Sequence, residues 1–280
     1  MSRTPVLGAA LALAAALLTG CGGSSVAPAM QAMLPTSPVT GAPISLVGLG
    51  DSIPAGDECP GCTPFVQLYG LQLAQARSAP VNVNNLGVGG WTSSDLLEAL
   101  QPGGDDAAAV AGADVVTVTI GANDFADQLP SYLAGDCGSL DGLGCFQPYL
   151  PQLRRTLTQV LERIAELRAG QPTQVLVTGY WNVFPDGSVA KDEYGPGFLT
   201  ASAALTGEAN AVIKAVATAR GAGYADLVTA FKGADARDDP TGLLADDGEH
   251  PDQQGHQLIA DVLAQIAPST LSPRSGTPAG

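Results

Sequence analysis

The chain has 280 residues, of which 45% are hydrophobic, and this length and composition suit a single globular domain with terminal extensions. Charged residues make up only 14% of the chain, and 12 Lys and Arg against 27 Asp and Glu give a formal net charge of −15 at pH 7. This acidic balance argues against nucleic acid or anionic lipid as an electrostatic partner.

The N-terminal segment has the features of an export signal. Arg3 supplies a positive charge, and an apolar run from Val6 to Leu18 ends just before Cys21. This run is shorter than the ~20 apolar residues that span a bilayer, and it fits a signal peptide. The sequence Leu-Thr-Gly-Cys at its end looks like a bacterial lipobox, which predicts a lipoprotein signal peptide over residues 1–20 and lipidation of Cys21. The alternative is ordinary secretory cleavage nearby, with Cys21 incidental. In both cases we expect an extracytoplasmic protein, either a membrane-anchored bacterial lipoprotein or a secreted one.

Two segments without hydrophobic periodicity flank the predicted domain. Residues 21–43 are rich in Gly, Ser, Pro and Ala and predict a flexible tether. Residues 268–280 have the same character and predict a disordered tail. The folded domain is therefore expected over residues 44–267.

Strand-like and helix-like segments alternate along this domain. The expected strands are Ile44–Leu49, Val81–Leu86, Val115–Ile120, Gln174–Gly179 and Tyr224–Val228. The expected helices are Thr63–Ala76, Ser94–Leu100, a strongly amphipathic segment from Leu150 to Leu167, Thr200–Arg220 and Asp252–Ile266. Such alternation predicts an α/β fold, a doubly wound domain in which a five-stranded parallel sheet is covered by helices on both faces.

The cysteines beyond Cys21 form two close pairs, Cys59 with Cys62 and Cys137 with Cys145. An even number in an exported chain indicates disulfides, and local pairing is the simplest of the three connectivities. A redox Cys-x-x-Cys pair and a zinc site are the alternatives. The first lacks a thioredoxin-like context, and the spacing of the second pair is a poor match to zinc ligands.

A serine follows the first expected strand directly, in the sequence Gly50-Asp51-Ser52. Ligands bind at the carboxyl ends of the strands in open α/β sheets, so the hydroxyl of Ser52 is placed to act as a nucleophile. A serine hydroxyl is a weak nucleophile and requires an adjacent base. The usual nucleophile elbow Gly-x-Ser-x-Gly is absent, which disfavours a standard α/β-hydrolase.

The chain contains two histidines, His250 and His256, so the search for this base is short. His250 lies in the loop before the last expected helix and is the candidate base, whereas His256 falls inside that helix and is expected to be a partly exposed helical residue. Asp247, three residues before His250, is placed to bind its far ring nitrogen. Asp246 and Glu249 are alternative carboxylates in the same acidic run.

A serine that attacks a carbonyl carbon also needs donors for the oxyanion of the tetrahedral intermediate. The candidates are the backbone N–H of Ser52, a glycine N–H from the segment Asn85-Leu-Gly-Val-Gly-Gly90, and the side-chain amide of Asn123. Asp51 and Asp124 allow a different interpretation, a carboxylate pair of the kind that hydrolyses glycosides.

Three motifs occur in a characteristic order: Gly-Asp-Ser at 50–52, Gly-x-Asn-Asp at 121–124 and Asp-x-x-His at 247–250. Together with the Asn85–Gly90 block they resemble the SGNH (GDSL) hydrolase family. The resemblance implies a flavodoxin-like, three-layer α/β/α domain. It selects Asp247 as the partner of His250 and Gly90, rather than Gly87 or Gly89, as the glycine donor. It also implies that Asp51 and Asp124 support loop geometry.

The resemblance implies a serine hydrolase that cleaves carboxylic esters of the lipase or esterase type, through Ser52, His250 and Asp247 and an acyl-enzyme intermediate. We expect no cofactor and no metal, an ester of a lipid, small molecule or sugar as substrate, no nucleic-acid partner, a membrane contact only through the lipid anchor, and a monomer. Deacetylation of O-acetyl polysaccharides, acyl transfer and non-catalytic binding at the cell surface are alternatives.

Six aromatic residues in or near the expected loops are candidates to line an acyl pocket, although each also fits ordinary packing. They are Trp91, Phe125, Phe146, Tyr180, Trp181 and Phe184.

Overall fold

The computed structural model describes residues 41–137 and 143–266. Its centre is a five-stranded sheet with the order β2-β1-β3-β4-β5, in which every neighbouring pair is parallel. This is the strand order of flavodoxin-like folds, so the predicted doubly wound domain is confirmed. The strands are β1 (Ile44–Gly50), β2 (Val81–Gly87), β3 (Val115–Thr119), β4 (Gln174–Thr178) and β5 (Gly223–Ala225).

The burial of the strands follows their positions in the sheet. All residues of the central strand β3 are buried, which explains its continuous β-branched sequence Val-Val-Thr-Val-Thr. The edge strand β2 instead begins with alternating half-buried and exposed residues, because one of its faces is open to solvent.

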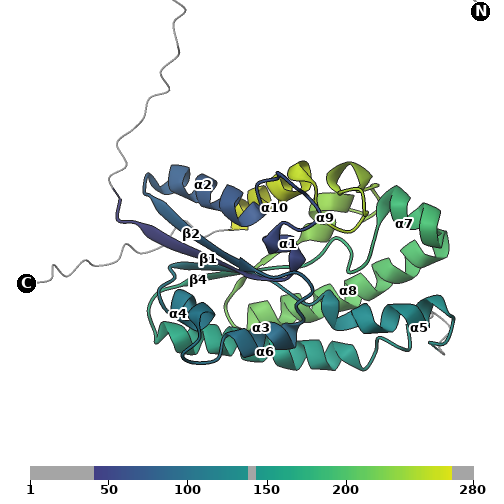
Figure 1. Cartoon of the computed structure of the whole chain (residues 1–280), viewed down its shortest axis with the longest axis horizontal. Helices are drawn as coiled ribbons and strands as arrows, with labels where there is room; N and C mark the ends of the chain where they lie inside the picture. The colour runs from purple at the N-terminus through teal and green to yellow at the C-terminus, as the bar shows by residue number, and fades with distance from the viewer. Residues whose placement is uncertain (1–40, 138–142, 267–280) are drawn as a thin grey trace, which may run out of the picture. The chain divides into compact units, whose positions relative to one another are not determined.

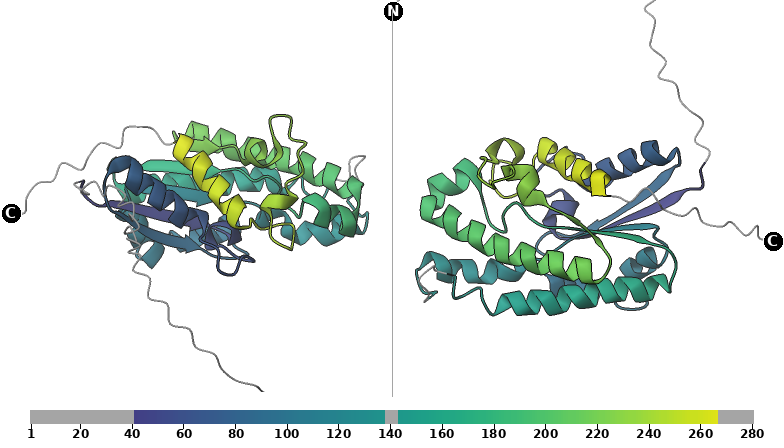
Figure 2. Two further views of the ribbon diagram at one scale, coloured as in Figure 1. Left: turned by 90° about the horizontal axis from the view of Figure 1, so that it is seen from above. Right: turned by 180° about the vertical axis from the view of Figure 1, so that it is seen from behind.

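Helices cover both faces of the sheet (Figure 1). Helices α2, α9 and α10 pack together over one face, and α3, α4, α6 and α8 pack over the other, as the view from behind in Figure 2 also shows. The α-helices are α1 (Ser52–Ala55), α2 (Phe65–Arg77), α3 (Ser93–Ala99), α4 (Asp105–Ala111), α5 (Leu129–Leu133), α6 (Tyr149–Arg168), α7 (Gly187–Tyr194), α8 (Pro196–Ala219), α9 (Leu227–Lys232) and α10 (Gln253–Ile266). Two 3-10 helices, η1 (Asn123–Gln128) and η2 (Thr241–Leu243), lie in the loops.

The amphipathic segment predicted from Leu150 to Leu167 forms α6. Its residues at three- and four-residue spacing, including Leu153, Leu157 and Ile164, are almost fully buried. These residues belong to the hydrophobic core, and α6 contacts α3, α4 and α8. The hydrophobic periodicity therefore predicted the helix correctly.

The end of the last predicted strand was wrong. We expected Tyr224–Val228 to be extended, but β5 ends at Ala225. The carboxylate of Asp226 accepts a hydrogen bond from the backbone N–H of Thr229 and thereby caps helix α9. An Asp that satisfies a first-turn N–H favours helix over strand, and this local bond ends the strand early.

Several predicted features lie outside the described residues. These are the signal peptide over 1–20, Cys21, most of the 21–43 tether and the 268–280 tail. Within residues 41–137 and 143–266, none of the helices has the length and apolar character needed to cross a membrane.

Candidate active site

Ser52 begins α1 immediately after β1, at the carboxyl end of the sheet. The turn between them requires a glycine, because Gly50 has φ +140° and a Cβ there would lie 1.8 Å from the carbonyl oxygen of Thr119. β1 lies between β2 and β3 in the sheet. The connection that leaves β1 leads to β2 on one side, and the connection that leaves β3 leads to β4 on the other side. This is the topological switch point, where ligands bind in open α/β folds. The Ser52 side chain is partly exposed and makes no hydrogen bond to another described residue.

Asp51, next to Ser52, is almost completely buried. Its Oδ1 accepts a hydrogen bond from the backbone N–H of Ile53 at 3.0 Å, and its Oδ2 accepts one from the Tyr180 hydroxyl at 2.5 Å. Burial raises the pKa of Asp51 to about 7, against the opposing effects of these hydrogen bonds and of the charge of His250. These contacts hold the turn before Ser52 and agree with a supporting role for Asp51.

The loop after β2 lies directly against the Ser52 turn. The backbone N–H of Val88 donates to the Gly50 carbonyl at 3.0 Å. A Cβ on Gly87 would clash with the backbone of α1, at 2.4 Å from the nitrogen of Ala55, so Gly87 allows close packing of this loop. Gly90 is exposed, has φ +79° and has no atom within 4 Å of an added Cβ. Of the glycines in this loop, Gly90 therefore faces the most open space.

Asn123 follows β3 and begins η1. Its side-chain nitrogen donates to the backbone carbonyl of Trp91 at 2.9 Å, which ties it to the loop that contains Gly90. A side-chain amide has two N–H donors, so a second one remains for a ligand.

The neighbouring Asp124 binds the same loop by two hydrogen bonds. Its carboxylate accepts from the Ser93 backbone at 2.8 Å and from the Ser93 hydroxyl at 2.5 Å. Burial raises the pKa of Asp124, and the Ser93 hydrogen bonds oppose the rise. These contacts and those of Asp51 hold loops in place, which fits a supporting role for the two carboxylates and not that of a pair that hydrolyses glycosides.

His250 and Asp247 are in direct contact. Oδ2 of Asp247 lies 2.5 Å from Nδ1 of His250, and its Oδ1 accepts the backbone N–H groups of Glu249 and His250 at 3.0 Å each. Burial opposes ionisation of Asp247, but the hydrogen bonds from His250 and the backbone hold its pKa below the usual value. The Nε2 atom of His250 is left for another partner. In Glu249, one of the alternatives, burial raises the pKa.

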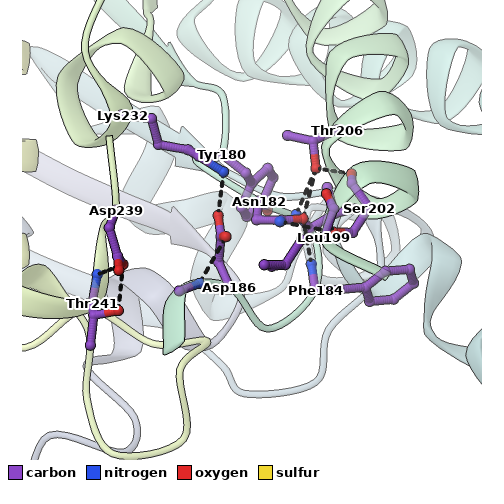
Figure 3. Close-up of polar contacts among 12 residues, drawn as sticks. Tyr180, Asn182, Phe184, Asp186, Leu199, Ser202, Thr206, Lys232, Asp239 and Thr241 are labelled. Carbon is purple, nitrogen blue, oxygen red and sulfur yellow. Dashed lines mark hydrogen bonds and ion pairs between the residues drawn. The ribbon is translucent and has the colours of Figure 1, made fainter. Parts of the chain in front are cut away.

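The loop that carries Asp247 and His250 is anchored from both sides. The backbone N–H of Ala245 donates to the His250 carbonyl at 2.8 Å, and the backbone N–H of Asp186 donates to the Gly248 carbonyl at 2.8 Å. The carboxylate of Asp186 in turn pairs with the ammonium group of Lys232 at 2.7 Å, and both side chains are nearly buried. Figure 3 shows Asp186 directed toward Lys232. Sequence reasoning missed this pair, which joins α9 to the segment before α7.

The loops after β1, β2 and β3 and the loop before α10 converge at one edge of the sheet. A Cβ on Gly89 would lie 4.0 Å from Cβ of Ser52, Asn123 bonds to the β2 loop, and the charge of His250 acts on Asp51 beside Ser52. These loops therefore bring Ser52, Gly89 and Asn123 together, and α10, which follows the His250 loop, is tied to the end of the loop after Ser52 by the bond from Thr63 to Gln253.

His256 is not partly exposed, as expected, but fully buried. It lies where α10 packs on α2, its Nδ1 accepts the backbone N–H of Phe65 at 3.3 Å, and its ring stacks on that of Phe65. Burial lowers the pKa of His256 to about 4, so the ring is neutral at neutral pH. The prediction failed because an imidazole is amphipathic and can satisfy a buried backbone donor.

The suggested aromatic acyl pocket is also corrected. Trp91 is partly exposed, whereas the other five aromatic residues are at most 5% exposed and pack in the core. The ring of Trp181 stacks on Phe231 at 4.3 Å, and Phe146 contacts both Phe125 and Phe184. The five buried side chains therefore belong to the hydrophobic core and do not line an open pocket.

The structure pairs the cysteines locally, Cys59 with Cys62 and Cys137 with Cys145. In the described part of the chain, no group of three or more His, Cys, Asp or Glu side chains is arranged to hold a metal ion.

The profile of the GDSL-like lipase/acylhydrolase family matches residues 49–258, a span that contains the whole of this site. The chain belongs to this family. It is therefore a hydrolase of carboxylic esters. A search of curated protein sequences found no match.

Several solved structures share the fold. The lipase Lip_vut3 from a goat rumen metagenome is 20% identical with a TM-score of 0.65, and the match covers 80% of this chain and 97% of the other. Phospholipase A1 from Streptomyces albidoflavus NA297 is 22% identical with a TM-score of 0.60, covering 80% and 99%. A catalytic mutant of the acetylxylan esterase Axe2 from Geobacillus stearothermophilus is 20% identical with a TM-score of 0.56, covering 81% and 95%.

Proposed function

We propose that this GDSL-type hydrolase cleaves its ester through Ser52, His250 and Asp247. The observation that carries the proposal is the contact between Asp247 and Nδ1 of His250. The loop that bears these residues leads into α10, and Gln253 of α10 accepts a hydrogen bond from Thr63, at the end of the loop that follows the Ser52 turn. A carboxylate at Nδ1 fixes the tautomer in which Nε2 accepts a proton, and it stabilises the imidazolium that forms.

In this mechanism the Ser52 oxygen attacks the ester carbonyl carbon as its proton passes to Nε2 of His250. The tetrahedral intermediate expels the alcohol, which takes that proton, and the acyl group remains bonded to Ser52. A water molecule then attacks the acyl-enzyme as His250 accepts one of its protons, and the carboxylic acid leaves as the proton returns to Ser52.

The oxyanion is held by three N–H donors. They are the backbone N–H groups of Ser52 and Gly90 and the side-chain amide of Asn123. The open space at Gly90 and the bond from Asn123 to Trp91 support this assignment, because the first leaves room for a substrate and the second orients the amide. Donors fixed before the reaction stabilise the developing charge without reorganisation.

Lipid and short-chain acyl esters are the proposed substrates, and O-acetyl groups on a polysaccharide are the second candidate. The first receives support from the likeness in fold to a lipase and to a phospholipase A1, and the second from the likeness to an acetylxylan esterase. Kinetics with p-nitrophenyl esters of rising chain length, run beside acetylated xylan, separates the two. Product analysis with an added acceptor alcohol separates hydrolysis from acyl transfer.

Active-site labelling tests the proposed nucleophile. A fluorophosphonate probe is expected to label the wild type and to lose its labelling in Ser52→Ala. Ser94→Ala is the matched control, because Ser94 is exposed on the surface of α3, and this variant is expected to label like the wild type. A wild type that never labels would indicate a non-catalytic binding protein, and a labelled Ser52→Ala variant would place the nucleophile elsewhere.

We also propose that the protein is exported and anchored by a lipid on Cys21. The apolar run followed by Leu-Thr-Gly-Cys supports this proposal. Metabolic labelling with radioactive palmitate is expected to mark the wild type but not Cys21→Ser. Equal labelling of the two proteins would contradict it.

A further inference from the structure

An exposed carboxylate lies beside the proposed nucleophile. A Cβ added to Gly89 would lie 2.2 Å from Oδ2 of Asp57 and 4.0 Å from Cβ of Ser52, so both side chains border the same point in space. Asp57 is exposed, and its carboxylate forms no hydrogen bond or ion pair with another described residue. The contacts of the described residues therefore give this carboxylate no structural role.

Local structure holds the backbone of Asp57 in this place. Its N–H donates to the carbonyl of Ser52 at 3.2 Å, because the preceding Gly56 ends α1 in the left-handed conformation. The loop that follows is closed by the Cys59–Cys62 disulfide. Farther along this loop, the backbone N–H of Thr63 donates to the side chain of Gln253 on α10 at 2.8 Å. The backbone that carries this carboxylate is thus held by the same turn that positions Ser52.

A negative charge at this point opposes the reaction of a neutral or anionic ester. The transition state carries a developing oxyanion, and a nearby carboxylate raises its energy. The same carboxylate lowers the energy of bound substrate and transition state when the substrate itself carries a positive charge nearby.

We infer that Asp57 determines charge specificity at this site, favouring esters that carry a cationic group close to the scissile bond over neutral esters of the same shape. The inference rests on the proposed function, since it requires the ester to react at Ser52. The substrate class it names is a cationic ester, such as an ester of a quaternary ammonium alcohol or acid.

Two isosteric pairs of esters test the inference from both sides of the scissile bond. The first pair is 2-(trimethylammonio)ethyl acetate and 3,3-dimethylbutyl acetate, which differ by one charge in the alcohol. The second is the p-nitrophenyl esters of 4-(trimethylammonio)butyrate and 5,5-dimethylhexanoate, which differ by one charge in the acyl group. The measured quantity is the ratio of kcat/KM for the cationic ester to that for the neutral one.

Asp57→Asn is expected to lower this ratio by about three- to tenfold in at least one pair, the effect of unit charges ~6 Å apart in a largely hydrated site. The effect should shrink at 0.5 M NaCl, because salt screens exposed charges. Glu58→Gln is the matched control. It removes the same charge from the neighbouring exposed residue, and it should keep the wild-type ratio.

The two proposals fail in different ways. If the fluorophosphonate probe never labels Ser52 and no ester is hydrolysed, the proposed function fails and this inference with it. If Ser52 is labelled and esters are hydrolysed, but Asp57→Asn keeps the wild-type ratio in both pairs, only the inference is overturned. An equal fall in Asp57→Asn and Glu58→Gln also overturns it, because the preference then follows the net charge of the protein.

Discussion

The Tyr180 hydroxyl binds the carboxyl group of Asp51, next to the proposed nucleophile Ser52, and Tyr180→Phe is expected to destabilise the protein in a pH-dependent manner. Tyr180 donates to Oδ2 of Asp51 at 2.5 Å, and both residues are 1% exposed. Burial raises the pKa of Tyr180 well above its usual value, so the hydroxyl remains a donor at neutral and mildly alkaline pH. The variant removes this donor and leaves the packing of the ring unchanged.

The sign of the pH dependence follows from the pKa of Asp51. Burial raises this pKa from 3.8 to about 7, so Asp51 contributes most to stability below pH 4 and loses that contribution as the pH rises through 7. The hydrogen bond from Tyr180 lowers this pKa, because it favours the carboxylate over the acid. Its removal raises the pKa of Asp51 further, so the wild type and the variant differ most in stability above pH 7.

The size of the effect depends on which form of Asp51 is present. At pH 5.5 Asp51 is protonated in both proteins, and the lost bond is worth about 1 kcal/mol. At pH 8.5 the wild type contains the carboxylate, and the loss rises to about 1.5–3 kcal/mol. Each pKa unit by which the variant exceeds the wild type adds ~1.4 kcal/mol to the difference.

Urea unfolding of the wild type and Tyr180→Phe at pH 5.5 and pH 8.5 measures how much free energy of unfolding the variant loses at each pH. Tyr69→Phe is the control, because Tyr69 is equally buried but its hydroxyl has no hydrogen-bond partner among the described residues. Its effect on the free energy of unfolding should be independent of pH. A loss in Tyr180→Phe that is equal at the two pH values would refute the linkage between Tyr180 and the ionisation of Asp51.

Three further substitutions test the proposed catalytic residues and the ion pair between Asp186 and Lys232. Asn123→Ala is expected to reduce kcat by about 10²–10³-fold, because it removes a proposed oxyanion donor, and to cost about 1 kcal/mol in urea unfolding, because the bond to Trp91 is lost; unchanged turnover would remove Asn123 from the oxyanion role. Asp247→Asn should lower kcat by about 10⁴-fold, since the amide favours the wrong tautomer of His250, and a loss below tenfold would point to another carboxylate. Lys232→Met leaves the Asp186 carboxylate buried and unpaired, which should cost about 3–5 kcal/mol in urea unfolding. A stability equal to the wild type would show that Asp186 finds water or another donor.

The sequence alone predicted the features that depend on local pattern. The segment Val115–Ile120 was predicted as a strand, the periodicity from Leu150 to Leu167 predicted a long amphipathic helix, and the alternation of strands and helices predicted a parallel sheet. The pairing of Asp247 with His250 was also accessible, because residues three apart in a short loop can contact each other without the rest of the fold.

Only the tertiary structure could show the contacts between residues that lie far apart in the chain. Tyr180 reaches Asp51 across 129 residues, Lys232 neutralises Asp186, and α2 buries His256 against the N–H of Phe65. A lone Tyr, Lys or His has no periodicity that reveals its partner, and its environment is decided by which helices and strands pack together. Local hydrogen bonds and side-chain spacing are properties of the sequence, whereas burial, and the pKa shifts that burial causes, belong to the assembled fold.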